Sequence, residues 1–455
     1  MTYIIAREYD LLVRGAAPGA AGIHGLPPES FDALRAFLQT PVEGHKGQEE
    51  VIARPTLRGN QPALRLQQWV GVIRTPDGTT VELLPKTHER DGEADGETVA
   101  HSRALLFRML AAAGDNYRAA LPADLDPAQM RLFEVVLRYA LEVLRAAIRR
   151  GVPHAYREVQ EERAGLRGRL DLSRQLRQPP HRVHLLHVTY DEFLPDRPET
   201  RLVRLAVERI ARMTARSDSR RLARELLHAL AGVPASRDVR RDFTRWKLER
   251  GYTHFAPSLD ICRLILNELN PLTAGTASRV TAVLFDMNRV YETYVAQLLR
   301  LQHPDWQVQT QVKGQHLGSF LPQPSGQARP VFALRPDLIV HPPGQPVIIA
   351  DTKWKRLKAD RAFPHGVGNA DAYQMLAYSE IFQPEPGQRR LCLIYPYLPG
   401  LPNQLPDIQL PGGRTLRVVL VDLHQDTPTV NLELTFDNIR ADSEVRAGVP
   451  DSAKS

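Results

Sequence analysis

Two short apolar segments between residues 331 and 354 most constrain how this chain can fold. The first reads VFALRPDLIV, the second reads VIIADTKW, and HPPGQP lies between them. Apolar runs of this length around a turn rich in proline and glycine predict two neighbouring strands. The first strand contains Asp337 and the second contains Asp351. Because apolar strands seldom carry carboxylates without a function, these two residues are candidates for a site.

The spacing of charged residues in the second strand predicts a common face. Asp351 and Lys353 are separated by one residue, so their side chains point the same way. If the turn brings Asp337 beside them, two carboxylates and an ammonium group meet at the edge of a sheet. Mg²⁺ prefers such oxygen ligands. We therefore expect Asp337 and Asp351 to bind Mg²⁺ with the carbonyl group of Thr352, and Lys353 to activate water and stabilise the transition state.

An Asp-x-Lys pattern also arises by chance, and a structural ion pair is the simpler alternative. Two further predicted helices contribute candidate residues. Gln374 and Tyr378 are four residues apart in the helix 371–382, so they share a face and can support the site. The alternative is that the tyrosine only packs into the core. Glu292, in the helix 285–302, can reach a metal directly or through water, unless it is a surface residue.

The elements around these residues follow the order α-β-β-β-α-β, which predicts a small mixed sheet with helices against it. In chain order they are helix 285–302, strand 306–312, strand 331–340, strand 347–354, helix 371–382 and strand 389–398.

A chain of 455 residues is too long for one ordinary core, so we expect a multidomain α+β or α/β protein. A β-rich and helical amino-terminal half should precede the sheet described above. It includes a hairpin at 68–86, helices at 132–150 and 200–230, and a short strand at 165–172. The predicted domains are a β-rich region at 1–100, a mainly helical region at 101–280, the domain at 281–440 that carries the candidate site, and a flexible polar tail at 441–455.

Composition excludes several classes of protein. The net charge of +7 favours a polyanionic partner without proving one. No apolar run approaches the ~18 residues that span a bilayer, and MTYIIAREYD is too charged for a signal peptide, so we expect a cytoplasmic protein without membrane contact. The two cysteines cannot form a disulfide scaffold. No phosphate-binding glycine loop occurs, and His181, His184 and His187 do not share one strand face.

Taken together, the motifs resemble the McrC family, the nuclease subunit of the McrBC modified-cytosine restriction system. McrC is a nuclease of the PD-(D/E)xK type. The matching residues lie in both halves of the chain: MNRVYETYV (287–295), RPDLIV (335–340), ADTKWK (350–355), DAYQMLAY (371–378), WVGVIRTPDGTTVELLPK (69–86), LRGRLDL (166–172) and YDEFLPDRPETRLVRLA (190–206).

The resemblance implies a Mg²⁺-dependent endonuclease for double-stranded DNA, with Asp337, Asp351 and Lys353 as its active site. It also implies a partner, McrB, a hexameric AAA+ GTPase that binds the GTP and carries its own recognition domain for modified DNA such as 5-methylcytosine. The subunit docks on this ring through its amino-terminal half, stimulates GTP hydrolysis, and restricts foreign DNA, including that of phages. For this chain, we expect residues 1–100 to supply the docking region.

Two alternatives stay open from the sequence. The chain could be a self-sufficient DNA nuclease, for instance in repair, with the arginine-rich helix 201–216 in contact with phosphates. It could also be a non-catalytic DNA-binding adaptor, although a degenerate site usually loses one residue of the Asp/Asp/Lys set.

Overall fold

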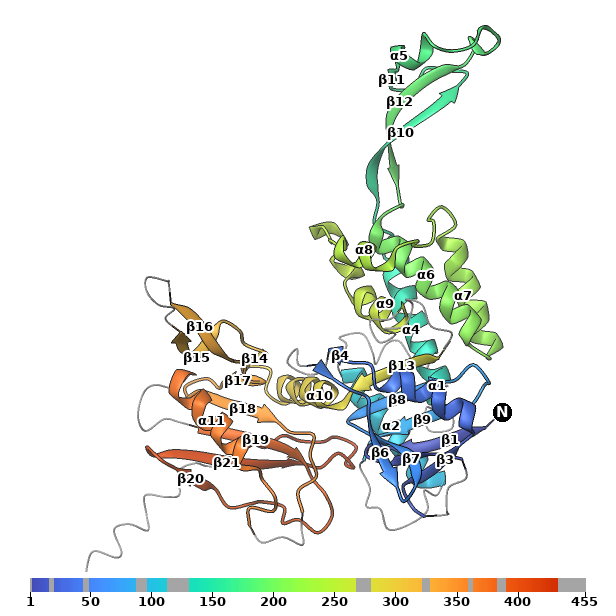
Figure 1. Cartoon of the computed structure of the whole chain (residues 1–455). Helices are drawn as coiled ribbons and strands as arrows, with labels where there is room; N and C mark the ends of the chain where they lie inside the picture. The colour runs from blue at the N-terminus through green and yellow to red at the C-terminus, as the bar shows by residue number, and fades with distance from the viewer. Residues whose placement is uncertain are drawn as a thin grey trace, which may run out of the picture. The chain divides into compact units, whose positions relative to one another are not determined.

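The computed structural model describes residues 2–15, 20–43, 49–86, 96–112, 131–266, 280–320, 328–358, 363–382 and 390–432. They belong to two compact units, Met1–Met287 and Asn288–Ser455. Each unit combines helices with mixed or antiparallel sheets, which agrees with the expected multidomain α+β class (Figure 1). The predicted tail at 441–455 lies outside the described residues.

Unit 1 begins with two four-stranded sheets and a helix that share one hydrophobic core. The predicted hairpin at 68–86 is confirmed: its strands pair antiparallel, and Gly78 in the turn has a φ of 88°. The first sheet has the order β1 (Tyr3–Arg7), β9 (Thr80–Leu84), β8 (Trp69–Arg74), β13 (Thr281–Asp286). The second has the order β3 (Ile23–Leu26), β2 (Leu11–Arg14), β7 (Gln61–Leu66), β6 (Ala53–Arg58), and α1 (Pro28–Leu38) packs beside it. A small pair, β4 (Val42–Glu43) and β5 (Glu49–Glu50), accompanies them.

A helical bundle forms the second part of unit 1. The predicted helix at 132–150 is α4, and it ends where Gly151 adopts a φ of 117°. The predicted helical stretch at 200–230 is divided into two helices. The helices of the bundle are α4 (Leu132–Arg149), α6 (Pro198–Met213), α7 (Ser217–Ala229), α8 (Val239–Thr244) and α9 (Pro257–Leu266). The helix α2 (Gly96–Ala112) instead contacts β9 of the first sheet, where Arg103 pairs with Glu82. Apolar residues of α4, α6, α7 and α9 form one core.

The arginine-rich face of α6 contacts the protein itself. Arg201 pairs with Asp196, and Arg204 donates to the carbonyl groups of Leu230 and Val233. Arg209 donates to the carbonyl group of Leu266, at 3.3 Å. These contacts fix α6 within the bundle, so these three arginines have structural partners other than phosphates.

A three-stranded sheet projects from this bundle (Figure 1). We call residues 155–194 the arm; they comprise β10 (Ala155–Arg163), β11 (Arg169–Leu170), the short helix α5 (Leu172–Gln175) and β12 (Leu186–Leu194). The sequence indicated only a short strand at 165–172, in a region expected to be mainly helical. The long pair β10–β12 was missed because only Val188 and Thr189 of these strands are buried, and because β10 reads AYREVQEER, without a regular apolar alternation.

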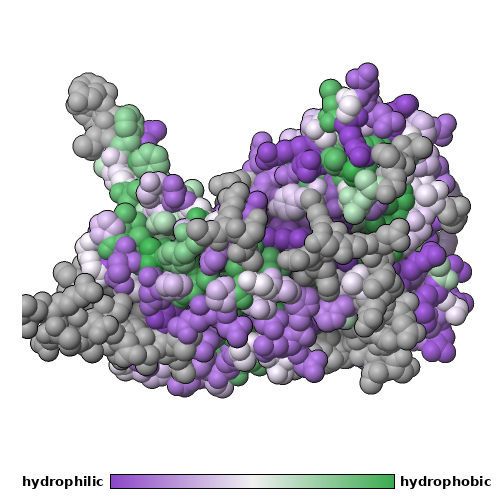
Figure 2. Space-filling view, turned by 90° about the horizontal axis from the view of Figure 1, so that it is seen from below, coloured by the Kyte–Doolittle hydropathy of each residue, from purple (hydrophilic) through white to green (hydrophobic). Residues whose placement is uncertain are grey.

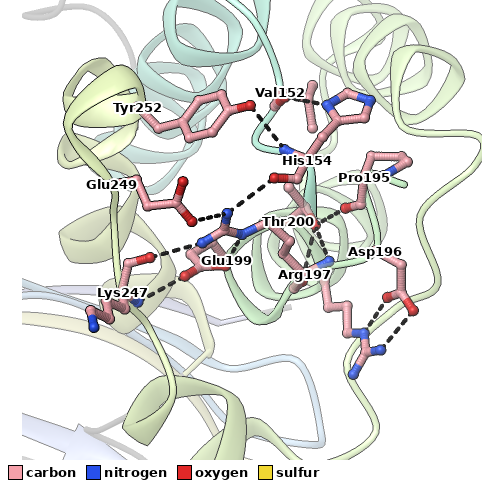
Figure 3. Close-up of polar contacts among 11 residues, drawn as sticks. Val152, His154, Pro195, Asp196, Arg197, Glu199, Thr200, Lys247, Glu249 and Tyr252 are labelled. Atoms are coloured by element: carbon pink, nitrogen blue, oxygen red, sulfur yellow. Dashed lines mark hydrogen bonds and ion pairs between the residues drawn. The ribbon is translucent and has the colours of Figure 1, made fainter. Parts of the chain in front are cut away.

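Arg197 fastens the base of the arm to the bundle (Figure 3). Its guanidinium donates to Glu199 at 3.2 Å and to Glu249 at 3.0 Å. The same group donates to the carbonyl groups of His154 at 3.1 Å and Lys247 at 3.0 Å. Arg197 is 8% exposed and Glu199 is 1% exposed, so this ion pair is shielded from water. The base of the arm is therefore held by a buried polar network.

Replacing Arg197 with methionine should lower the free energy of unfolding by about 3–5 kcal/mol, because the buried Glu199 carboxylate would lose its charged partner. Arg201→Met is the matched control, since Arg201 pairs with the more accessible Asp196 and should cost about 1 kcal/mol or less. Urea unfolding of the full chain, followed by tryptophan fluorescence, measures both. Equal losses in the two variants would contradict the role given to Arg197.

In its described residues, unit 2 contains a six-stranded mixed sheet, two helices and a separate hairpin. The sheet has the order β14 (Gln307–Thr310), β17 (Leu338–His341), β18 (Ile348–Thr352), β19 (Arg390–Pro396), β21 (Arg414–Val421), β20 (Ile408–Leu410). The helices are α10 (Met287–Gln302) and α11 (Asn369–Phe382), and the hairpin is formed by β15 (Gln315–Phe320) and β16 (Arg329–Leu334).

Most elements expected in this unit are present, but the predicted strand 331–340 is divided. Residues 329–334 belong to the separate hairpin, and residues 338–341 belong to the main sheet. Pro336 lies at the division, where a proline cannot donate to a strand ladder. The last two strands, β20 and β21, extend the sheet beyond the predicted order.

Candidate active site

Asp337 and Asp351 face one another at the end of the β17–β18 hairpin. The antiparallel register pairs Leu338 with Ala350, so the next positions outward are the two aspartates. Both residues are fully buried, with 0% exposure. Burying a carboxylate is costly unless hydrogen bonds, a countercharge or a metal stabilises it. The hairpin therefore concentrates two negative charges at one point of the sheet.

The Asp337 carboxylate is fixed by the opposite strand. One of its oxygens, Oδ2, accepts hydrogen bonds from the backbone N–H and the hydroxyl group of Thr352, both at 2.8 Å. The carbonyl group of Asp337 also accepts from the N–H of Gln311 at 3.0 Å. Thr352 thus holds Asp337 in place and is itself the residue between Asp351 and Lys353.

Lys353 lies against the second aspartate, as the spacing predicted. Its Nζ atom is 2.6 Å from Oδ2 of Asp351 and donates to Oε1 of Gln374 at 2.8 Å. Its backbone N–H donates to the carbonyl group of Ile394 in β19, at 2.8 Å. The side chain is 14% exposed, so the ammonium group lies between the buried carboxylate and the surface.

Gln374 and Tyr378 connect α11 to the same site. Nε2 of Gln374 donates to the hydroxyl group of Tyr378 at 2.7 Å. That hydroxyl group donates to the carbonyl group of Arg335 at 3.0 Å, two residues before Asp337. The predicted shared face of the two residues is present, and it links Lys353 to the backbone beside Asp337. Tyr378 also packs in the core of the unit, as the alternative expected, and its support of an active site stays a prediction.

Glu292 reaches the site through another residue. It is 4% exposed and accepts a hydrogen bond from the side-chain amide of Gln311, whose backbone N–H donates to Asp337. In the part of the chain that the structure describes, no three His, Cys, Asp or Glu side chains gather in a way that could hold a metal ion. A direct metal contact by Glu292 stays a prediction, and the three histidines of the arm region form no such group either.

Asp371 is a site residue that the sequence reading missed. Its carboxylate is 2.9 Å from Nζ of Lys355 and 3.4 Å from Nζ of Lys353, and it accepts from the hydroxyl group of Tyr395 at 3.2 Å. Burial raises the pKa of Asp371, but the hydrogen bond from Lys355 and the charges of both lysines outweigh it, so the pKa is lowered. Asp371 precedes Gln374 by one helical turn, and that spacing was the available signal.

The donor set at the hairpin end fits a hard divalent cation. Two carboxylates and the backbone carbonyl group of Thr352 offer only oxygen atoms, and Mg²⁺ is usually held by one or two carboxylates together with waters. The two cysteines take no part in this arrangement. Cys262 and Cys392 are buried free thiols, and burial raises the pKa of Cys392 to about 12. None of the described helices combines the length and the apolar character that a membrane crossing requires.

Comparisons with known proteins identify the family and a similar fold. A family model described as the McrBC 5-methylcytosine restriction system component matches residues 64–396. A chain from the tetradecameric assembly of Thermococcus gammatolerans McrB AAA+ hexamers with bound McrC has a similar fold, with a TM-score of 0.59 and 19% identity over 92% of this chain and 94% of that chain. A chain of the Thermococcus gammatolerans McrBC complex matches with a TM-score of 0.44 and 20% identity, over 66% of this chain and 87% of that chain. No curated protein matches.

Proposed function

The chain belongs to the McrBC 5-methylcytosine restriction system family, and we propose that it is the Mg²⁺-dependent DNA endonuclease subunit of such a system. The observation that carries this proposal is the buried pair Asp337 and Asp351, with Nζ of Lys353 at 2.6 Å from the second carboxylate. Two carboxylates and a lysine at one edge of a sheet are the residues expected of a PD-(D/E)xK nuclease core, and they support this proposal. We further propose that the protein acts in the cytoplasm, on double-stranded DNA.

The residues of the site have separate tasks in this proposal. Asp337, Asp351 and the carbonyl group of Thr352 would hold Mg²⁺, which when bound lowers the pKa of water and neutralises charge on the phosphate. Lys353 holds its ammonium group beside Asp351 through the bond to Gln374, where it can orient the attacking water and stabilise negative charge on the phosphate oxygens. Asp371 and Tyr378 limit the positions that Lys353 and Gln374 can take.

The arm is the surface best suited to a protein partner. Large apolar side chains are exposed along it: Tyr156 (74%), Leu166 (66%), Leu172 (63%), Leu176 (85%), Val183 (60%) and Phe193 (52%). The rings of Tyr156 and Phe193 contact one another at 5.0 Å between centroids. Clustered exposed apolar residues of this kind mark interaction sites.

We therefore propose that the arm, rather than residues 1–100 as first expected, docks on an AAA+ GTPase ring. The similar Thermococcus gammatolerans structure contains McrB AAA+ hexamers with bound McrC. On this account the partner binds and hydrolyses GTP and selects modified DNA, and the present chain cuts it.

A cleavage assay separates this proposal from the alternatives. Methylated and unmethylated plasmids are incubated with Mg²⁺ and the full chain, alone or with an McrB-like AAA+ protein plus GTP. Cutting only with partner and GTP is expected. Cutting by the chain alone would favour the self-sufficient nuclease, and no cutting in any mixture would contradict the nuclease assignment.

The double variant Tyr156→Ala/Phe193→Ala should reduce stimulation of the partner's GTP hydrolysis by about 10-fold or more, since truncating aromatic anchors at an interface typically costs 1 kcal/mol or more each. Both side chains are exposed, so the melting temperature should stay within a few degrees of the wild type. Phosphate release by the mixed proteins measures the effect. If the double variant, tested at the same concentration as the wild type, stimulates GTP hydrolysis normally, docking occurs elsewhere.

A further inference from the structure

The hairpin β15–β16 of unit 2 exposes large apolar side chains beside the candidate site. Phe332 is 73% exposed, Phe320 is 57% exposed and Leu317 is 48% exposed. In Figure 2, hydrophobic residues extend along the projecting part at the left, where Figure 1 places this hairpin. The proposed cleavage chemistry uses none of these side chains, so their exposure needs another explanation.

Phe332 is held in a conformation that non-glycine residues rarely adopt. Its φ is 59°, and the ladder between the two strands is interrupted where Leu317 and Phe332 would pair. The Phe332 ring lies alongside Gly318: a Cβ atom there would be 3.9 Å from Cδ2 of the ring. A left-handed conformation at such a residue is strained, and such outliers concentrate at functional sites. The hairpin therefore presents this ring to solvent at an energetic cost.

The charged residues of the hairpin and of the short loops that flank it are all positive. Lys313, Arg329 and Arg335 form no side-chain hydrogen bond or ion pair with any residue that the structure describes. The segment from Trp306 to Pro336 contains no acidic residue at all. This differs from α6, three of whose arginines are engaged by carboxylates and carbonyl groups. Cationic side chains without carboxylate partners can bind phosphates, and exposed aromatic rings can contact flat apolar surfaces. DNA offers both its phosphates and the flat faces of its bases, so it suits this hairpin.

The base of the hairpin is anchored beside the candidate site. Leu334, its last residue, is packed in the core of the unit with Tyr378. The hydroxyl group of Tyr378 donates to the carbonyl group of Arg335. Only Arg335 and Pro336 separate β16 from Asp337. DNA held by the hairpin would thus lie next to the two aspartates.

We infer that the hairpin β15–β16 is a DNA-contact element: Lys313, Arg329 and Arg335 bind phosphates, and Phe332 acts as an apolar wedge against the bases in the minor groove. Apolar side chains inserted between base steps in this way unstack them locally. The inference rests on the proposed nuclease function, because it names how the substrate is held at that site.

Binding of a DNA duplex by the full chain tests the inference without cleavage. Ca²⁺ replaces Mg²⁺, and the duplex carries 2-aminopurine, whose fluorescence rises when a base is unstacked. Phe332→Ala should weaken binding by about 10-fold and abolish the fluorescence rise, since one base–aromatic contact contributes about 1–3 kcal/mol. Arg329→Ala should reduce the slope of log affinity against log salt by about 1.

Tyr156→Ala is the matched control, because Tyr156 is 74% exposed and Phe332 is 73% exposed. It should leave DNA binding unchanged, whereas Phe332→Ala should leave stimulation of the partner's GTP hydrolysis unchanged. The inference is overturned if the wild type binds no DNA, if Phe332→Ala and Arg329→Ala bind like the wild type, or if Phe332→Ala instead alters the oligomeric state. Failure of the nuclease proposal would give a different result: the wild-type complex would bind the duplex but would never cut plasmid with Mg²⁺.

Discussion

The variant Asp351→Asn is expected to reduce DNA cleavage by the assembled complex by at least about 10³-fold, equivalent to about 4 kcal/mol of transition-state stabilisation. Asp351 is fully buried opposite Asp337, so its amide would keep the volume of the side chain while removing one of the two carboxylate charges. A hard cation would lose a charged ligand and Lys353 would lose its nearest partner. Initial rates of plasmid cleavage with partner, GTP and Mg²⁺ measure this loss.

Assembly with the partner should survive this change, because the docking surface that we propose lies in unit 1. Asp305→Asn serves as the control: Asp305 is exposed and belongs to unit 2, so the same charge change there should leave cleavage within about twofold. If Asp351→Asn cuts at the wild-type rate while remaining folded, the site assignment is wrong.

The second large effect is expected for Lys353→Met, which should reduce cleavage by about 10²-fold or more with only a modest change in metal affinity. Lys353 contributes no oxygen ligand, whereas its ammonium group lies beside Asp351 and is aimed by Gln374. The dependence of the cleavage rate on Mg²⁺ concentration separates the two quantities. The maximal rate should fall, and the Mg²⁺ concentration at half-maximal rate should shift by no more than about threefold.

Lys355→Met provides a matched comparison for Lys353. Both lysines approach Asp371, but the side chain of Lys355 is 58% exposed and that of Lys353 is 14% exposed. Of these two lysines, Lys353 is the one that contacts Asp351, the proposed metal ligand. Lys355→Met should therefore change cleavage by less than about threefold. Complete loss of metal binding in Lys353→Met, or equal effects of the two variants, would contradict the role proposed for Lys353.

The two strands that carry the candidate site could be predicted because their patterns are local. An apolar run, a turn and a second apolar run determine an antiparallel pair, and alternation of side chains then places Asp351 and Lys353 on one face. The helical spacing of Gln374 and Tyr378 likewise determined that they share a face. Whether these residues perform catalysis depends on the substrate and the metal, and stays a proposal.

The parts that escaped prediction have little apolar periodicity or depend on distant contacts. The arm exposes both faces of its sheet, so β10 looks like a polar segment in the sequence. Asp371 acquires its importance from lysines outside its own helix, and its one-turn spacing from Gln374 does not reveal those contacts. The separate hairpin β15–β16 arises because Pro336 interrupts a strand that otherwise looks continuous.

The most direct test of the central claim maps where the chain holds a divalent metal. Fe²⁺ is substituted for Mg²⁺ in the wild-type protein, ascorbate and peroxide are added, and the sites of backbone scission are identified by mass spectrometry. The account predicts scission close to Asp337 and Asp351, and its loss in the double variant Asp337→Asn/Asp351→Asn. Scission elsewhere in the chain, or an unchanged pattern in the double variant, would contradict the proposed metal site.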